Sequence, residues 1–162
     1  MLFRSDIYPD SLEVNLRQVN RLFRGLLKLL LNMGAAAIVD ATAKRISKTS
    51  PVAEWGLEEG MHVTGTSSPY RYLRKISEFN TADVSKLIKQ DVLLLAGNED
   101  HLIPMGHLYR QIDMLKNARS ITTRVFTKNE SASAHCQVGN YGLALRTIVS
   151  WLDEMTERAA AS

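Results

Sequence analysis

The stretch that decides the fold is QDVLLLAGNEDHLIP, residues 90–104. Its first half, residues 91–97, is a short apolar run between an aspartate and a glycine. Such a run is typical of a strand that is buried on both faces of a parallel sheet. Its second half is a polar loop that ends at a proline. The stretch therefore predicts a strand that delivers acidic side chains into a loop.

The residues after this stretch predict an alternation of helices and strands. We expect a helix at 105–117, a second strand in SITTRVFT at 120–127, and a final helix at 141–158. Strand, helix and strand at this length form a crossover unit with parallel strands. Five apolar residues of the final helix are expected to face inward: Leu143, Leu145, Ile148, Val149 and Leu152.

The residues before it predict only helices. An amphipathic helix is expected at 12–33, where apolar residues recur at spacings of three and four and basic residues occupy the opposite face. Its apolar face comprises Leu12, Leu16, Val19, Phe23, Leu26, Leu27 and Leu30. Further helices are expected at about 35–47, 51–63, 69–79 and 81–88. No strand is expected before residue 90.

These patterns predict an α/β fold in two parts. Residues 1–89 form an all-helical region, and residues 90–162 form an α/β region with two parallel strands and flanking helices. Serine followed by proline is the start signal of a helix, and it occurs at Ser50 and at Ser68. Trp55 and His62 are expected to pack within the helical region or to line its floor.

Composition excludes several classes of protein. A hydrophobic content of 45% and a charged content of 23% are typical of a folded globular chain. The net charge of +3 is mild and the basic residues form no block, so nucleic-acid binding is not expected. The single cysteine, Cys136, excludes an internal disulfide and favours a reducing compartment, so we expect a cytoplasmic protein. The longest uncharged run of the helix at 12–33 and its continuation, residues 29–39, is too short for a membrane anchor.

Two polar clusters follow the two predicted strands. The first is GNEDHLIP at 97–104, and the second is KNESASAHCQVGN at 128–140. Loops after the carboxyl ends of parallel strands share one crevice, so Asp100 and His135 are expected to lie together. An aspartate that accepts a hydrogen bond from one imidazole nitrogen fixes the tautomer and leaves the other nitrogen as a base. Asp100 could also simply cap the turn that follows it, but the downstream His135 favours the catalytic interpretation.

This order of elements resembles the carboxyl-terminal part of an α/β-hydrolase. QDVLLLAGNEDHLIP and AHCQVGN, followed by WL at 151–152, are similar to capped esterases and acyl-peptidase-like hydrolases. The resemblance covers residues 90–153. It implies that Asp100 is the catalytic acid after the seventh strand and His135 the base after the eighth. It also implies that residues 11–80 form a cap inserted between strands six and seven, and that the substrate is a small ester or amide.

The sequence departs from this family at the nucleophile. Such hydrolases use a serine in a Gly-x-Ser-x-Gly elbow that precedes the acid, and this sequence contains no such motif. The nearest stretch is GTSSP at 65–69, which lacks the second glycine; Ser67 and Ser68 are better explained as helix caps. On this resemblance the chain begins where the sixth strand should already have ended. We therefore expect the chain alone to be inactive, unless a separate chain supplies the serine half.

Other residues near the predicted site have simpler interpretations. Glu99 is an alternative acid, although the family pattern places the acid at Asp100, four residues before Pro104. His101 and His107 match no familiar metal-ligand spacing with Asp100, so no metal and no cofactor are expected.

Cys136 is not expected to act as a nucleophile with its neighbour His135. Adjacent side chains point apart, whereas a nucleophile and its base must meet within hydrogen-bond reach. A buried structural thiol is therefore the expected role of Cys136.

The small sheet also predicts association. Two buried parallel strands do not form a stable sheet alone, and the strand at 92–96 would leave an unpaired edge. We therefore expect a homo-oligomer or a complementing chain that covers this edge. The alternative function is a non-catalytic remnant or an oligomerising interaction module that uses the helix at 12–33 as its binding face.

Overall fold

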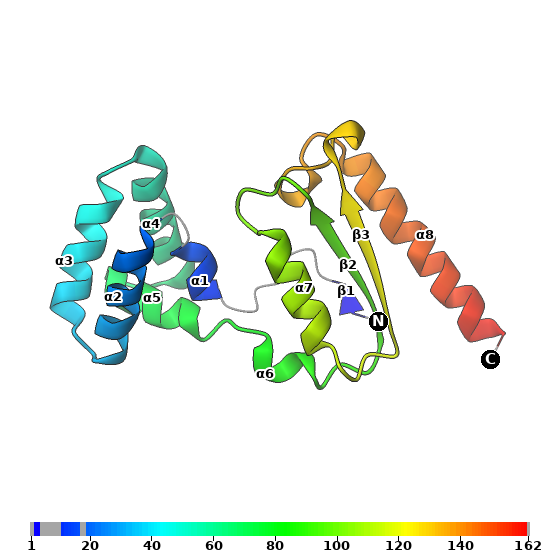
Figure 1. Cartoon of the computed structure of the whole chain (residues 1–162), viewed down its shortest axis with the longest axis horizontal. Coiled ribbons are helices and arrows are strands. Elements are labelled where there is room, and N and C mark those ends of the chain that lie inside the picture. The colour runs from blue at the N-terminus through cyan, green and yellow to red at the C-terminus, as the bar shows by residue number, and fades with distance from the viewer. Residues whose placement is uncertain (1, 4–10, 17–18, 162) are drawn as a thin grey trace. The chain divides into compact units, whose positions relative to one another are not determined.

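The computed structural model describes residues 2–3, 11–16 and 19–161 of the chain (Figure 1). Their contacts divide them into two compact units. The helical unit comprises the described residues from 11 to 80, and the α/β unit comprises residues 81–161 together with the first strand. The expected division lay between residues 89 and 90, whereas the observed one follows Asn80.

The α/β unit is built on a parallel sheet, so the mixed α/β class expected from the sequence is confirmed. Its strands are β1 (Leu2–Phe3), β2 (Asp91–Gly97) and β3 (Ser120–Phe126), in the spatial order β1-β2-β3. The register pairs Asp91 with Ser120 at one end of β2 and Gly97 with Phe126 at the other.

The expectation of no strand before residue 90 is wrong, because β1 pairs in parallel with Val92 and Leu93. Two residues are too few to show a period in the sequence, which is why the pattern gave no signal there. The sequence also predicted that one edge of β2 would be unpaired, and this prediction is wrong where β1 lies. That edge is covered by β1 over Val92 and Leu93.

Two helices cover opposite faces of β2 (Figure 1). Val92 and Leu94 pack in one cluster with Leu108 of α7 (Met105–Met114). The alternate residues Leu93 and Leu95 pack in another cluster with Trp151 of α8 (Tyr141–Ala160). Successive side chains of a strand point to opposite faces, so β2 must be apolar throughout. The prediction of a strand buried on both faces is confirmed.

The inward face of α8 differs in part from the expectation. Ala144 and Trp151 are buried and Ile148 is half-buried, whereas Leu145 and Val149 are 60% and 54% exposed. A helix on a flat sheet buries one narrow stripe, and residues 144, 148 and 151 already fill it. Apolar character alone therefore assigned Leu145 and Val149 to the wrong side.

Helix α6 (Ala82–Ser85) explains why the units divide at residue 80. It is shorter than the expected helix at 81–88. The amide of Gln111 on α7 donates to Oγ of the fully buried Ser85 at 2.8 Å and accepts from Oγ1 of Thr81 at 2.9 Å. These bonds attach residues 81–85 to α7 of the α/β unit.

The helical unit consists of five helices around one apolar core. They are α1 (Ser11–Asn15), α2 (Arg21–Asn32), α3 (Ala36–Ser47), α4 (Pro51–Thr64) and α5 (Pro69–Ser77). The core comprises Leu16, Leu27, Leu31, Val39, Tyr72, Leu73 and Ile76. The predicted caps are confirmed, because Ser50 Oγ accepts from the N–H of Ala53 and Ser68 Oγ from that of Arg71. Trp55 and His62 are exposed on α4 and do not pack inside the unit as expected.

The long helix expected at 12–33 is not continuous. Helix α1 ends at Asn15 and α2 begins at Arg21, where the side chain of Asn20 accepts from the N–H of Leu22 at 3.0 Å. An asparagine in this position favours a new helix start over continuation, because its side chain satisfies a backbone donor. The expected apolar face is consequently wrong at Phe23 and Leu26, which are 50% and 45% exposed.

No helix in the described ranges is both long enough and apolar enough to cross a lipid bilayer.

Candidate active site

The loops after β2 and β3 leave the sheet at the same edge, because these parallel strands end at paired residues, Gly97 and Phe126. The first loop is bonded to the end of β3 and to the second loop. The N–H of Asn98 donates to the carbonyl of Phe126 at 2.9 Å, and the N–H of Glu99 donates to the carbonyl of Ser133 at 3.1 Å. The two polar clusters of the sequence therefore form one structure.

Gly97 permits this close approach. A Cβ atom at this position would lie 2.2 Å from the carbonyl oxygen of Ser133, which is backbone and cannot rotate away. The hydroxyl of Ser133 also donates to Oε2 of Glu99 at 2.8 Å. Glu99, the alternative acid in the sequence, thus holds the second loop, while Asp100 is the acid that meets the histidine.

Asp100 and His135 meet at this junction. Nδ1 of His135 lies 2.9 Å from Oδ2 of Asp100. The other carboxylate oxygen accepts from the N–H groups of Leu102 at 2.8 Å and Ile103 at 2.9 Å. Asp100 therefore caps the following turn with one oxygen and meets the imidazole with the other.

The geometry assigns different tasks to the two imidazole nitrogens. A carboxylate is an acceptor only, so the hydrogen bond to Asp100 favours the tautomer with the proton on Nδ1. Nε2 is then left with a lone pair. The side chain of Asp100 is 8% exposed and that of His135 is 22% exposed. The carboxylate is shielded, while the imidazole retains access to a reacting group.

The loop after β3 is braced at its start by Glu130. The carboxylate accepts from both the N–H and the hydroxyl of Thr127 at 3.0 Å, and it forms an ion pair with Arg124. These interactions, the Thr127 bonds first, lower the pKa of Glu130. The amide of Asn140 then donates to the carbonyl of Glu130 at 2.9 Å. The segment that contains His135 is therefore anchored at both ends.

Backbone strain is concentrated beside the histidine. Cys136 and Gln137 have φ angles of 53° and 54°, and Ser131 has 55°. Left-handed conformations are unfavourable for residues with a Cβ and occur where the surrounding structure imposes them, often at functional sites. Two of these residues directly follow His135. Cys136 itself is half-buried, not fully buried as expected.

The serines considered as nucleophiles belong to the helical unit. Ser68 caps α5, which confirms its interpretation as a helix cap. Ser67 is not the cap, and its Oγ accepts from the side chain of Arg71 at 3.4 Å. Among the described residues, Ser67 and Ser68 belong to the helical unit, whereas His135 belongs to the α/β unit. The same described ranges contain no cluster of three or more His, Cys, Asp or Glu residues that could hold a metal ion.

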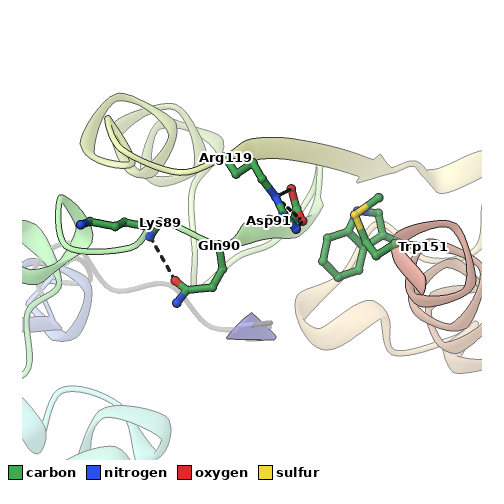
Figure 2. Close-up of a pocket in the computed structure, with 6 residues that line it drawn as sticks. Lys89, Gln90, Asp91, Arg119 and Trp151 are labelled. Atoms are coloured by element: carbon green, nitrogen blue, oxygen red, sulfur yellow. Dashed lines mark hydrogen bonds and ion pairs between the residues drawn. The ribbon is translucent and has the colours of Figure 1, made fainter. Parts of the chain in front are cut away.

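A separate hollow of about 240 Å³ lies at the amino ends of β2 and β3 (Figure 2). Its lining comprises Lys89, Gln90, Asp91, Arg119, Trp151 and Met155. Asp100 and His135 lie at the carboxyl ends of the same strands, so this hollow is separate from their site. Loops at the carboxyl ends are the usual location of chemistry in parallel sheets.

Asp91 in this hollow is already paired. Nε of Arg119 donates to its carboxylate at 2.9 Å, and the hydroxyl of Ser120 donates at 2.6 Å. The Arg119 bond, followed by the Ser120 bond, lowers the pKa of Asp91 from 3.8 to about 2. This pair joins the start of β2 to the start of β3, and its role is structural.

Comparison of the chain with family models, with curated proteins and with solved structures gave no match.

Proposed function

We propose that the α/β unit carries the acid–base pair of a serine hydrolase that acts on a small ester or amide. In this proposal His135 is the general base and Asp100 orients it. The 2.9 Å contact between Nδ1 and Oδ2 carries the proposal. The backbone bonds to the second oxygen of Asp100 add to it, because they fix the carboxylate in the orientation that the imidazole requires.

The position of the pair on the sheet supports the same reaction. Both residues come from loops at the carboxyl ends of neighbouring parallel strands, where α/β enzymes place their reacting groups. Strand β1 extends the sheet on the other side of β2. A larger parallel sheet would continue from that side, and it would bring further loops to the same edge.

In the proposed reaction the pair moves one proton. Nε2 of His135 takes the proton of a serine hydroxyl as its oxygen attacks the acyl carbon, and it later gives that proton to the leaving group. Asp100 stabilises the imidazolium that exists between the two transfers. The 162 residues contain no Gly-x-Ser-x-Gly elbow, so we propose that the serine comes from outside them and that they are not hydrolytic alone.

The first test measures the tautomer of His135 by ¹⁵N-detected NMR. We expect a protonated Nδ1 and an unprotonated Nε2 above neutral pH. Asp100→Asn should abolish this preference, because an amide can also donate to Nδ1. Asp113→Asn is the matched control, since Asp113 is exposed on α7. A wild-type histidine protonated on Nε2 would contradict the proposal.

The second test measures hydrolysis of p-nitrophenyl acetate by the wild type, His135→Ala and Asp100→Ala. We expect all three to be equally inert, because the general base has no serine to activate. Activity that both substitutions abolish would show that a nucleophile is present within these residues. That result would keep the acid–base pair and reject its dependence on an external serine.

A further inference from the structure

The bond to Asp100 fixes one end of the His135 imidazole but not the direction of the ring plane. Nδ1 lies 2.9 Å from Oδ2 of Asp100, and a single hydrogen bond lets the ring tilt about the bonded atom. The χ2 torsion of histidine is broad, so the side chain itself restricts that tilt only weakly. A general base must also point its other nitrogen at the proton that it takes, at about 3 Å from the donor atom. A second restraint on the ring would therefore make His135 a better base.

The ring of His101 lies against the ring of His135. The centroids of the two imidazoles are 6.4 Å apart, and their planes are inclined at 75°. Aromatic rings that pack edge to face have centroid separations of about 4.5–7 Å, so these imidazoles form such a pair. A ring packed at nearly a right angle opposes tilting, which a hydrogen bond at one atom does not.

The backbone of His101 is held on both sides through Asp100. Before His101, the N–H of Asp100 donates to the carbonyl of Gly97 at 3.3 Å. After it, Oδ1 of Asp100 accepts from the N–H groups of Leu102 at 2.8 Å and Ile103 at 2.9 Å. His101 therefore lies within a closed turn, and its side chain starts from a fixed point although the residue is exposed.

Asp100 thus organises both imidazoles with one carboxylate. Oδ2 meets Nδ1 of His135, and Oδ1 closes the turn that contains His101. Because both oxygens belong to one rigid planar group, the two rings are placed relative to the same reference.

The two loops are also joined close to both rings. Glu99 lies two residues before His101, and Ser133 lies two residues before His135. The N–H of Glu99 donates to the carbonyl of Ser133 at 3.1 Å, and the hydroxyl of Ser133 donates to Oε2 of Glu99 at 2.8 Å. After the second histidine, the N–H of Val138 donates to the carbonyl of His135 at 3.2 Å. The contact between the rings therefore follows from the fold of both loops.

We propose that His101 is a positioning residue, which holds the plane of the His135 imidazole and so directs Nε2 toward the reacting proton. This inference rests on the proposed function, in which His135 is the general base. His101 acts through its ring and takes no part in the proton transfer. Without that ring, the hydrogen bond between His135 and Asp100 can still form, but it opens more often. The strength of an aromatic pair corresponds to opening that is about 2- to 10-fold more frequent.

The test follows the Nδ1 proton of His135 by NMR of the full chain above neutral pH. Exchange of this proton with water requires the bond to Asp100 to open, so the exchange rate reports the opening. We expect His101→Ala to raise the rate about 2- to 10-fold. His101→Phe should leave it near the wild-type rate, because phenylalanine retains a ring. His101→Gln should behave like His101→Ala, since glutamine keeps a polar N–H but has no ring.

His62→Ala is the matched control, because His62 is an exposed histidine of the helical unit. It should leave the exchange rate of the His135 proton unchanged. The urea midpoint of each variant, followed by the fluorescence of the buried Trp151, checks that the α/β unit remains folded.

The outcomes separate the role of His101 from the proposed function. The wild type should show a nuclear Overhauser effect between the two imidazole rings. Its absence, or an exchange rate that His101→Ala leaves unchanged while Nδ1 stays protonated, would overturn the role of His101 and leave the proposed function intact. A rate that glutamine restores and phenylalanine does not would replace ring packing by a hydrogen bond and overturn the inference. A wild-type His135 protonated on Nε2 would reject the proposed function and this inference together.

Discussion

The two units differ in how their surfaces are completed. In the α/β unit, the exposed ends of the sheet are closed by specific polar bonds: Asp91 with Arg119 at one end, and Asp100 with His135 at the other. In the helical unit, the outer sides of α2 and α4 leave large apolar side chains in solvent. Polar bonds thus complete the ends of the sheet in the α/β unit, whereas the helical unit leaves large apolar side chains exposed on α2 and α4.

The largest expected effect compares a buried with an exposed phenylalanine. Phe126 is fully buried in the α/β unit, and Phe23 of α2 is 50% exposed. Phe126→Ala should lower the free energy of unfolding of the α/β unit by about 3–5 kcal/mol, because it removes core contacts and leaves a cavity. Phe23→Ala should change that value by less than about 0.5 kcal/mol.

The measurement is urea unfolding followed by the fluorescence of Trp151. This residue is buried in the α/β unit, whereas Trp55 is exposed in the helical unit. A Trp55→Phe background therefore restricts the signal to the α/β unit. A loss from Phe23→Ala as large as that from Phe126→Ala would contradict the exposed position of Phe23.

The next effect concerns the junction of the two loops. Gly97→Ala should destabilise the α/β unit by about 1–3 kcal/mol, because the added Cβ meets the carbonyl of Ser133. The loop that contains Ser133 would have to move away from the added Cβ. This movement should separate His135 from Asp100 and remove the Nδ1 proton signal from the NMR spectrum. Gly106→Ala on α7 is the matched control, since its Cβ meets nothing within 4 Å. A Gly97→Ala variant with an intact His135 signal would contradict the close approach.

The smallest effect is the pH dependence that arises from Asp91. Its pKa in the folded chain is about 2, below the ordinary value of 3.8. A lowered folded pKa stabilises the fold fully above the ordinary value, and this contribution is lost as the pH falls through about 2. Asp91→Asn should therefore be less stable than the wild type at pH 6, and the difference should vanish near pH 2.

The expected difference is about 1 kcal/mol, because the side chain of Arg119 is 74% exposed and water weakens the pair. Urea midpoints of both proteins, measured between pH 6 and pH 2, check it. Asp113→Asn, at an exposed position of α7, supplies the control. A constant difference across the range would mean that the loss comes from packing and not from ionisation.

The sequence predicted the elements best where each has a strong local signal. The apolar run at 91–97 required burial on both faces, and the serine–proline pairs at Ser50 and Ser68 marked helix starts through their own side chains. The same reasoning failed where local signals compete. An apolar stripe from Leu12 to Leu30 predicted one helix, although Asn20 caps a second helix start within it.

The candidate site was predicted for a topological reason. Asp100 and His135 are 35 positions apart, but both follow neighbouring parallel strands, and parallel strands place their following loops at one edge. The roles of Glu99 and Ser133 could not be predicted this way. Their hydrogen bond depends on how two loops without regular structure fold against each other, and no sequence period reports that.

The sequence by itself determined most of the helices, the buried strand and the proximity of Asp100 and His135. Each of these follows from the side chains of one segment or from the order of segments along the chain. Only the tertiary structure decided that Glu99 braces the loop while Asp100 meets the imidazole, that β1 joins the sheet, and which sides of α2 and α4 remain in solvent. These features arise from contacts between distant segments, whose packing no local pattern encodes.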